Sequence, residues 1–354
     1  MRLVSLATEA WRNTLTGTSR AGLLAVVLAF IAAGAGALDA LAVAALERQA
    51  VAFQSAGANI RGVAADEGMV DAAACEKLAE ADTISSAGAV AAAPPVDLAA
   101  TPGTSLQSYR VTPSLARLLG IVDALDFGVW MPTQLAEDLG LSRGDSMQSK
   151  SGEMILAATY EWPNDGRDSR FAYSVLMPTA PLGGWDECWA AAWPLVAGND
   201  DLLKATVTVA GGQQANVGQV NLTHGVGLDG HAAFLSRPTR LSLYAAGTMA
   251  FGLGVFASRR RRLEHAAALH AGESRAALIT QTGLETLAWA TLGVALAVEA
   301  VWLFIGRLDP PDPRAIFAIQ ASACGFAGAA AMAGSLLGCS LTRERHLFKY
   351  FKTR

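Results

Sequence analysis

Residues 21–38 read AGLLAVVLAFIAAGAGAL, an apolar run without a single charged residue. After Asp39 the apolar character resumes as far as Leu46. About 20 apolar residues in a helix, each rising 1.5 Å, cover a hydrocarbon core of about 30 Å. The run therefore predicts a transmembrane helix over residues 21–46.

Three more apolar stretches follow along the chain, over residues 241–258, 286–305 and 315–341. Only 16% of the 354 residues are charged and 52% are hydrophobic, whereas soluble domains carry about 25% charged residues. The sequence thus predicts a membrane protein with four transmembrane α-helices. Core helices of a soluble protein are the less favoured alternative.

Basic residues flank these stretches at alternating ends. The segments 1–20, 259–281 and 342–354 together hold 13 of the 27 Lys and Arg residues. Positive flanks stay in the cytoplasm, so both termini and the loop 259–285 are expected there. Between Arg48 and Arg240, 12 basic residues accompany 21 acidic ones. Residues 47–240 and the short link 306–314 are then external, in a chain that crosses the plasma membrane several times.

The N-terminal segment allows two interpretations. A basic start, an apolar run and the small residues 33–37 are also typical of a secretory signal peptide. A retained span is favoured, because the apolar run is long and resumes after Asp39. The apolar face of residues 1–20 predicts a cytoplasmic interfacial helix, with Trp11 at headgroup depth.

The external region is long enough for its own core, and its mixed patterns predict an α+β domain. Strands are expected at residues 83–93, 109–112, 154–162 and 171–177. Short helices are expected at residues 113–119, 132–139 and 185–193. Cys75 and Cys188 lie in this region, and in an oxidising compartment a disulfide between them is expected, with two free thiols as the alternative. Cys324 and Cys339 both fall in the fourth span and are expected to be small packing residues.

The sequence indicates no catalytic residues and no metal site. His224 and His231 flank a glycine-rich stretch, but no nearby Cys or His completes a ligand set, which favours a surface loop. A solvated acidic face is expected from Asp165, Asp168, Asp186, Glu187, Asp200 and Asp201. Core packing is favoured over a substrate-contacting wall for Trp162, Trp185, Trp189 and Trp193. The sequon at Asn221 matters only in a host that glycosylates.

Two carboxylates, Asp39 and Glu299, lie inside predicted spans. They either reach the outer interface or belong to a substrate path or a subunit contact, because membrane carboxylates normally face protein or water. Gly334 and Gly338 form a GxxxG pattern in the fourth span. Such a pattern favours close helix packing, either within the bundle or across a dimer.

Residues 259–285 read RRRRLEHAAALHAGESRAALITQTGLE. Nucleic-acid binding is disfavoured, because the arginines abut a span and the loop carries no aromatic platform. Orientation in the membrane explains the arginines, but not the apolar spacing after them. Leu263, Ala266, Ala267 and Leu269 predict a helix that Gly272 interrupts.

The order Arg-Arg-x-x-Glu264, Ala268-Leu269-x-Ala271-Gly272, Ser274-Arg275 and Glu285 resembles the cytoplasmic loop of FtsX-like permeases. That family includes the MacB-type macrolide and peptide exporters and the lipoprotein-releasing permeases. The order of one span, a large external domain and three further spans is also similar. The stretches Tyr109-Arg-Val-Thr-Pro113 and Gly128-Val-Trp-Met-Pro132 resemble the family's porter-type α+β domain. His270 departs from the family pattern, in which a glycine is common.

The resemblance implies a membrane subunit that is not itself an enzyme and binds no cofactor. Its coupling loop would dock on a separate ABC ATPase, which holds ATP and Mg; this chain contains no GxxxxGK[ST] motif. The coupling residues implied are Arg262, Glu264, Leu269, Gly272, Ser274, Arg275 and Glu285. A second permease copy, in a homodimer or a heterodimer, is implied as well.

The function implied is the export or extraction of an amphipathic substrate, such as a peptide, lipopeptide or antibiotic, by mechanical motion of the external domain. An alternative is a mechanotransmitter that regulates an external cell-wall hydrolase or another accessory protein. A third is an ATP-independent membrane receptor or sensor. Nucleic acid is not an expected partner.

Overall fold

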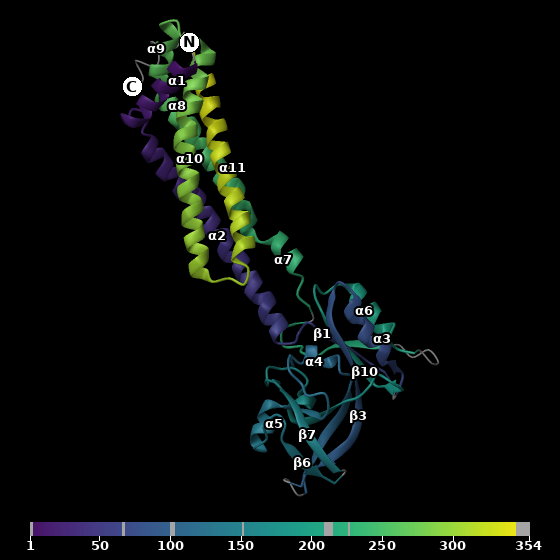
Figure 1. The fold of residues 1–354 in the computed structure, drawn as a ribbon. Helices are drawn as coiled ribbons and strands as arrows, with labels where there is room; N and C mark the ends of the chain where they lie inside the picture. The colour runs from purple at the N-terminus through teal and green to yellow at the C-terminus, as the bar shows by residue number, and fades with distance from the viewer. Residues whose placement is uncertain are drawn as a thin grey trace. The chain divides into compact units, whose positions relative to one another are not determined.

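The computed structural model describes residues 3–65, 68–99, 103–150, 152–208, 215–225 and 227–344. The chain divides into two compact units (Figure 1). We call residues 1–49 with 231–354 the helical unit, and residues 50–230 the α+β unit. The α+β unit ends before residue 240, the boundary expected from the sequence. Phe234 and Arg237 account for this, because Phe234 packs on the helical core and Arg237 pairs with Asp39.

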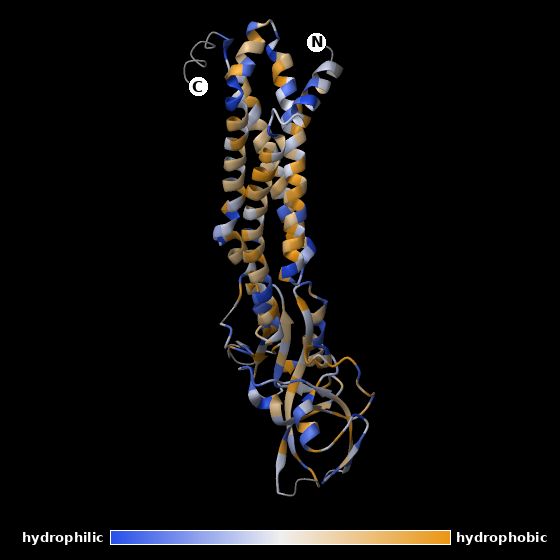
Figure 2. Ribbon diagram, turned by 90° about the vertical axis from the view of Figure 1, so that its left-hand side faces the viewer, coloured by the Kyte–Doolittle hydropathy of each residue, from blue (hydrophilic) through white to orange (hydrophobic). Residues whose placement is uncertain are grey.

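The helical unit contains four helices that are long and apolar enough to cross a membrane. They are Ala21–Ser55, Pro238–Arg260, Arg275–Leu308 and Pro313–Ser340. Figure 2 shows hydrophobic residues along their lengths. The remaining elements of the unit are shorter. Its helices are α1 (Leu3–Leu15), α2 (Ala21–Ser55), α7 (Gly230–Ser236), η3 (Pro238–Leu241), α8 (Ser242–Arg260), α9 (Arg262–His270), α10 (Arg275–Leu308) and α11 (Pro313–Ser340).

Small residues let the spans approach closely. A Cβ atom at Gly254 of α8 would overlap the carbonyl oxygen of Ala331 in α11, and one at Gly334 would overlap the carbonyl oxygen of Phe251. Side chains at these positions would therefore push α8 and α11 apart. Glycine here serves close backbone approach, as is usual between helices in lipid.

The α+β unit is built on a mixed sheet of nine strands, ordered β11-β1-β10-β3-β4-β8-β5-β7-β6. The pairs β4–β8 and β5–β7 are parallel and the other main pairs are antiparallel. The strands are β1 (Ile60–Ala64), β3 (Ile84–Asp97), β4 (Ser105–Val111), β5 (Val129–Pro132), β6 (Ser146–Ser149), β7 (Gly152–Tyr160), β8 (Ser174–Pro178), β10 (Glu187–Ala192) and β11 (Asn216–Gln219). A second, two-stranded sheet pairs β2 (Val70–Asp71) with β9 (Gly184–Trp185).

Six short helical segments cover this sheet. They are α3 (Ala72–Lys77), η1 (Leu78–Glu80), α4 (Leu115–Leu118), α5 (Thr133–Asp138), η2 (Ser169–Tyr173) and α6 (Ala197–Lys204). The small residues of β3 make room for them: a Cβ on Gly88 would clash with Leu115 of α4. The α+β class predicted from the sequence is thus confirmed, with strands in all four predicted regions.

The helix predicted over residues 185–193 is wrong. The segment forms β9 and β10 instead, and β10 is paired on both sides, with β1 and with β3. Alanine favours a helix in isolation, but tertiary pairing overrides a weak local preference. Nearly all of β10 is buried, which explains why the strand lacks the alternating pattern of a half-exposed one.

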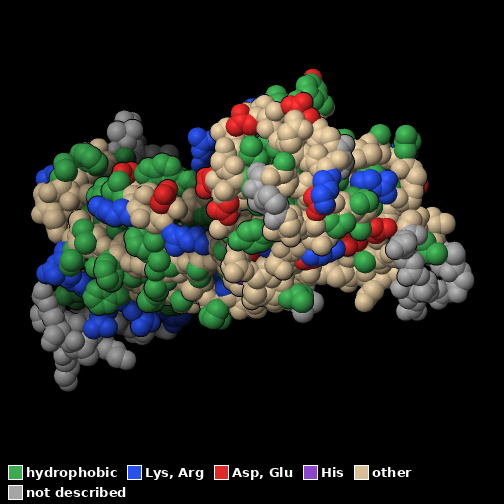
Figure 3. Space-filling view, turned by 90° about the horizontal axis from the view of Figure 1, so that it is seen from below, with side chains coloured by type: hydrophobic (Ala, Val, Ile, Leu, Met, Phe, Trp, Pro, Cys, Tyr) green, Lys and Arg blue, Asp and Glu red, His purple; other side chains and the backbone are tan. Residues whose placement is uncertain are grey.

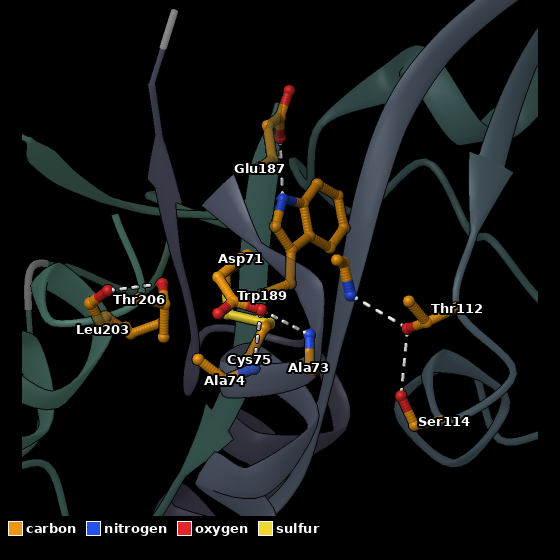
Figure 4. Close-up of a disulfide and its surroundings, with 12 residues drawn as sticks. Asp71, Ala73, Ala74, Cys75, Thr112, Ser114, Glu187, Trp189, Leu203 and Thr206 are labelled. Carbon is orange, nitrogen blue, oxygen red and sulfur yellow. Dashed lines mark hydrogen bonds between the residues drawn. A yellow bond between two sulfur atoms is a disulfide. The ribbon is translucent and has the colours of Figure 1, made fainter. Parts of the chain in front are cut away.

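A disulfide joins α3 to β10 through Cys75 and Cys188, as predicted, and both residues are fully buried (Figure 4). Their Cα atoms are 5.8 Å apart, within the usual range for this bond. Asp71 starts α3 by accepting hydrogen bonds from the backbone amides of Ala73 and Ala74. The cross-link therefore fixes a capped helix onto a central strand.

The tryptophans of the α+β unit belong mainly to its core. Phe171 stacks on Trp189 with ring centroids 4.9 Å apart, and Trp162 packs on Phe171 at 5.4 Å. Trp185 is fully buried beneath Arg110. The core interpretation of these side chains is confirmed.

Most of the carboxylates expected to form a solvated acidic face are paired with arginines, although the Asp201 side chain is 79% exposed. Arg170 binds both Asp168 and Glu187, at 2.7 and 2.6 Å. Arg61 pairs with Asp200 at 2.8 Å. In Figure 3, acidic and basic side chains are interspersed on the face in view. Arg167 and Arg170 lie only two residues from Asp165 and Asp168, whereas Arg61 and Asp200 are far apart in the sequence.

Asn221, the acceptor position of the sequon, is fully buried. Its side-chain amide donates a hydrogen bond to the carbonyl oxygen of Ala56 at 2.9 Å. In the folded unit the side chain is thus enclosed and holds the chain near Ala56.

Candidate functional site

The loop between α8 and α10 folds into the short helix α9. Arg261, with φ −95° and ψ 14°, interrupts the helix after α8 and starts α9. Gly272 has φ +94°, a conformation that glycine adopts at little cost, and it follows the end of α9. Ser274 then caps α10 by accepting a hydrogen bond from the amide of Ala277 at 3.2 Å. The helix predicted before Gly272 is therefore present.

One face of α9 is buried and the other is open. His265 and Ala266 are buried, whereas the Glu264 side chain is 56% exposed. Arg262 and Leu269 are half-buried, and Gly272, Ser274 and Arg275 are exposed. Most of the predicted coupling residues are thus exposed or half-buried.

Arg261 joins the exposed surface to the interior. Its Nε donates to Glu264 at 2.7 Å, and its guanidinium also forms an ion pair with Glu285 of α10. Asn13 of α1 donates from Nδ2 to the other carboxylate oxygen of Glu285 at 2.8 Å. Three helices, α1, α9 and α10, are therefore connected through one guanidinium and one carboxylate.

Two carboxylates stabilise the charged form of Arg261. Burial would lower the pKa of this guanidinium, but the charges of Glu285 and Glu264 outweigh that effect and raise the pKa above its usual value. The Arg261 side chain is 17% exposed and that of Glu285 only 5%. Breaking a pair this buried costs far more than breaking a surface pair.

A small polar cavity of about 20 Å³ lies beside this pair, with room for about one water molecule. Its walls include Ser258, Arg261, His265, Thr282, Glu285, Thr286 and Ser335. Within the described part of the chain, His265 Nδ1 has no hydrogen-bond partner. Burial, reinforced by the charge of Arg261, lowers the pKa of His265 to about 4. His265 is therefore neutral near pH 7 and does not oppose the charge of Arg261.

Glu285, one of the coupling residues that the resemblance implied, lies inside the bundle. At 5% exposure its carboxylate is enclosed by Arg261 and Asn13. Its role in the structure is to position α9. It lies on the buried face of α10.

Sequence reasoning missed Arg261, Asn13 and His265. Arg261 was hidden in a run of four arginines, all of which were assigned to membrane orientation. Asn13 is a polar residue in an otherwise amphipathic segment, and its distance from Glu285 in the sequence concealed the pairing. The signal that could have revealed the link is Glu285 itself, since a carboxylate at the start of a span requires a partner.

The other end of α9 also has an ionic contact. His270 Nδ1 lies 2.9 Å from Glu344, just beyond α11. Both side chains are more than half exposed, so this contact is weakly stabilising. The remainder of the predicted basic tail, residues 345–354, lies outside the described residues.

Asp39, predicted as an intramembrane polar residue, is buried in an ion pair. Arg237 binds it through two nitrogens, at 2.9 and 3.2 Å, and Gln320 of α11 donates to it at 2.9 Å. The carboxylate is thus neither exposed at an interface nor open to a substrate. Glu299, the second such residue, is exposed on α10.

Gly334 and Gly338 face α8 within the same chain. A Cβ on Gly338 would lie 2.9 Å from the Cβ of Ser258, and Gly334 lies against Phe251. Of the two roles considered for the GxxxG pattern, the structure shows packing within the bundle.

Comparison with known proteins finds only a weak likeness. No family model matches the chain, and no curated protein matches it. Among solved structures, it is similar to the periplasmic region of MacB from Actinobacillus actinomycetemcomitans, with a TM-score of 0.34 and 9% identity. The match covers 48% of this chain and 92% of that one. A likeness of this strength does not establish a shared family.

Proposed function

We propose that this chain is the membrane subunit of an ABC complex of the FtsX and MacB type, which works with a separate ATPase subunit. The observation that carries the proposal is the geometry of α9. It is a short helix between two spans, anchored from inside by Arg261 and Glu285 and open on its outer face at Glu264. A helix held in this way can receive a push from a partner and pass it to the spans.

The surface proposed to meet the ATPase consists of Glu264, Leu269, Gly272, Ser274 and Arg275. Its charges, Glu264 and Arg275, are accessible, and Leu269 offers a partly exposed apolar contact. Rim charges of this kind govern the rate and specificity of association, and the apolar contact contributes affinity. Arg261 and Glu285 are more buried than this surface, and we propose that their ion pair holds α9 in position.

ATP and Mg are proposed to bind in the partner chain, and the chain itself is proposed not to be an enzyme. The absence of a GxxxxGK[ST] motif from the sequence supports this division of labour. A second copy of the permease, identical or related, would complete the complex. We place α9 and both termini in the cytoplasm and the α+β unit outside. The basic flanks support this orientation, as does the disulfide, which persists in oxidising compartments.

The output we propose is mechanical. Nucleotide-driven motion of the ATPase moves α9, α8 and α10, and the spans pass this motion to the α+β unit, which expels or extracts an amphipathic substrate. The four apolar helices and the separately folded α+β unit supply the parts that such a mechanism needs.

The test is affinity purification of the detergent-solubilised chain, with mass spectrometry of the proteins that accompany it. An ABC ATPase is expected at a stoichiometric level. Arg275→Glu, which reverses an exposed charge, should lower the amount of bound ATPase about tenfold, or about 1.4 kcal/mol.

Leu182→Asp, at an exposed position in the α+β unit, is the matched control and should retain the ATPase. Purification without any ATPase would overturn the proposal. Equal retention by both variants would overturn the docking surface.

A further inference from the structure

Glu299 stands out among the polar residues of the spans. It lies on the exposed side of α10, and in the described part of the chain it forms no hydrogen bond and no ion pair. Asp39 shows how the same bundle accommodates another carboxylate: with a bidentate arginine and a glutamine amide. Among the described residues, no comparable set of hydrogen-bonding partners surrounds Glu299.

Several polar groups of the neighbouring spans are satisfied within the chain. Thr286 hydrogen-bonds Ser335, and Ser335 also hydrogen-bonds Ser258. On the exposed side of α10, Thr291 donates to the carbonyl oxygen of Leu287 at 2.7 Å. The unpaired state of Glu299 therefore differs from that of these hydroxyl groups and of Asp39.

Glu299 lies within the apolar part of α10. It is two and a half turns before Leu308, the last residue of the helix, and so about 13 Å from that end at 1.5 Å per residue. Helical side chains lean toward the N-terminus of their helix, which directs this carboxylate deeper into the apolar layer. Trp302 lies between it and the nearer end and is half-exposed, packed edge-on against Phe317.

The surface around Glu299 is apolar and open. Leu292, Leu296 and Leu303 are each about half exposed on α10, and they recur at helical spacing with Glu299 on one face. The opposite face of α10, with Gly293 and Ala297, is buried in the bundle. α10 thus presents an apolar stripe that has a single acidic group at its centre.

We propose that this stripe docks a transmembrane helix of a different protein, and that this helix places a basic side chain opposite Glu299. Charged groups at this depth pair with each other or face water, and an ion pair removes the cost of leaving Glu299 in lipid. The apolar neighbours would provide the packing contact on either side of the pair.

A second copy of this chain fits the stripe poorly. A two-fold axis along the membrane normal through this contact would bring two Glu299 carboxylates together at the same depth. Like charges in a medium of low dielectric constant repel strongly. Charge complementarity therefore selects a basic partner helix over a copy of α10.

The experiment is photo-crosslinking in cells from p-benzoylphenylalanine placed at Leu296 or Leu303. We expect a covalent product with a different membrane protein, whose crosslinked peptide is a span with a Lys or Arg within one turn. Glu299→Leu should lower the yield about tenfold, or about 1.4 kcal/mol. Exchanging the two charges, Glu299→Lys with the partner's basic residue changed to Glu, should restore it.

The crosslinker at Leu23, exposed on α2, is the matched control, and its products should not change with Glu299→Leu. A product with another copy of this chain, with lipid alone, or with a protein whose capture ignores position 299 would overturn the proposal. Binding of the ATPase should be unaffected by Glu299→Leu, so failure here is distinguishable from failure of the proposed function.

Discussion

Arg261 holds two carboxylates in very different surroundings. Glu264 is on the surface of α9, and Glu285 is inside the bundle, yet both bind the same guanidinium. Removing Glu285 leaves a buried cation with half of its neutralising charge, whereas removing Glu264 leaves the interior intact. The two acids therefore differ in what they contribute to stability.

We predict that Glu285→Ala lowers the free energy of unfolding by about 3–5 kcal/mol, the usual cost of breaking a buried pair. Glu264→Ala should cost less than about 1 kcal/mol, because its carboxylate is mostly solvated. Denaturant unfolding of the two variants in one detergent measures the difference. Equal losses would show that Glu285 is not an internal anchor.

His265 makes stability depend on pH. Its pKa in the folded chain is about 4, below the unfolded value of about 6.5, so the unfolded chain binds more protons between these limits. The contribution of neutral His265 to the free energy of unfolding is fully present above pH 6.5. It is lost as the pH falls toward 4, by about 3 kcal/mol in all.

Unfolding of His265→Gln between pH 4 and 8 tests this expectation, and the variant should lose that part of the pH dependence. His231→Gln, at an exposed position, is the control and should keep it. A pH profile of His265→Gln identical to that of the unaltered protein would contradict the assignment.

Helices α8 and α11 contact each other through backbone atoms as well as through side chains. Gly254 and Gly334 each lie against a carbonyl of the other helix, so the two helices cannot separate or rotate without losing that contact. This pair of spans is expected to move as one piece.

Gly334→Ala should therefore destabilise the bundle by about 1–3 kcal/mol, the usual cost of overpacking. Gly325→Ala, on the same helix but with open space around the new Cβ, should be neutral or stabilising by up to about 1 kcal/mol. Thermal unfolding in detergent, followed by tryptophan fluorescence, compares the two. A smaller loss for Gly334→Ala than for Gly325→Ala would refute the close-packed contact.

The sequence was sufficient for elements whose signal is local. An apolar run such as residues 21–38 gives a long apolar helix because its length and composition leave few other options. Gly272 marks the end of α9 through its own backbone. The segment 185–193 was misassigned because its neighbours β1 and β3 decide its conformation, and neither is near it in sequence.

Only part of the candidate site could be predicted from the sequence in the same way. The exposed residues of α9, such as Glu264, follow from helical spacing and loop position. The anchoring by Asn13 does not, because a hydrogen bond between α1 and α10 depends on how the bundle closes. The burial of Glu285 likewise depends on the folded chain and does not follow from helical spacing.

For the whole molecule, the orientation in the membrane is the property that most constrains function. In the orientation that we propose, with the α+β unit external, a cysteine placed at exposed Val122 reacts with an impermeant maleimide in intact cells. A cysteine at exposed Ser274 should react only after the membrane is permeabilised. The four natural cysteines are buried and should contribute little. Labelling of Ser274→Cys in intact cells would reverse the proposed topology.

The ion pair between Asp39 and Arg237 affects how readily the α+β unit could be replaced by another domain during evolution. The polypeptide leaves the helical unit through α2 and returns through η3, and this pair ties the two crossings together on the helical side. The sequence between them is therefore an insert whose two connections to the bundle are held together by residues of the bundle, while Asn221 and Ala56 join the ends of the insert itself. Recombination that replaced residues 50–230 with an unrelated domain would leave the bundle's own contacts intact. Chimeras joined beyond this pair, rather than within it, are the ones expected to express as folded membrane proteins.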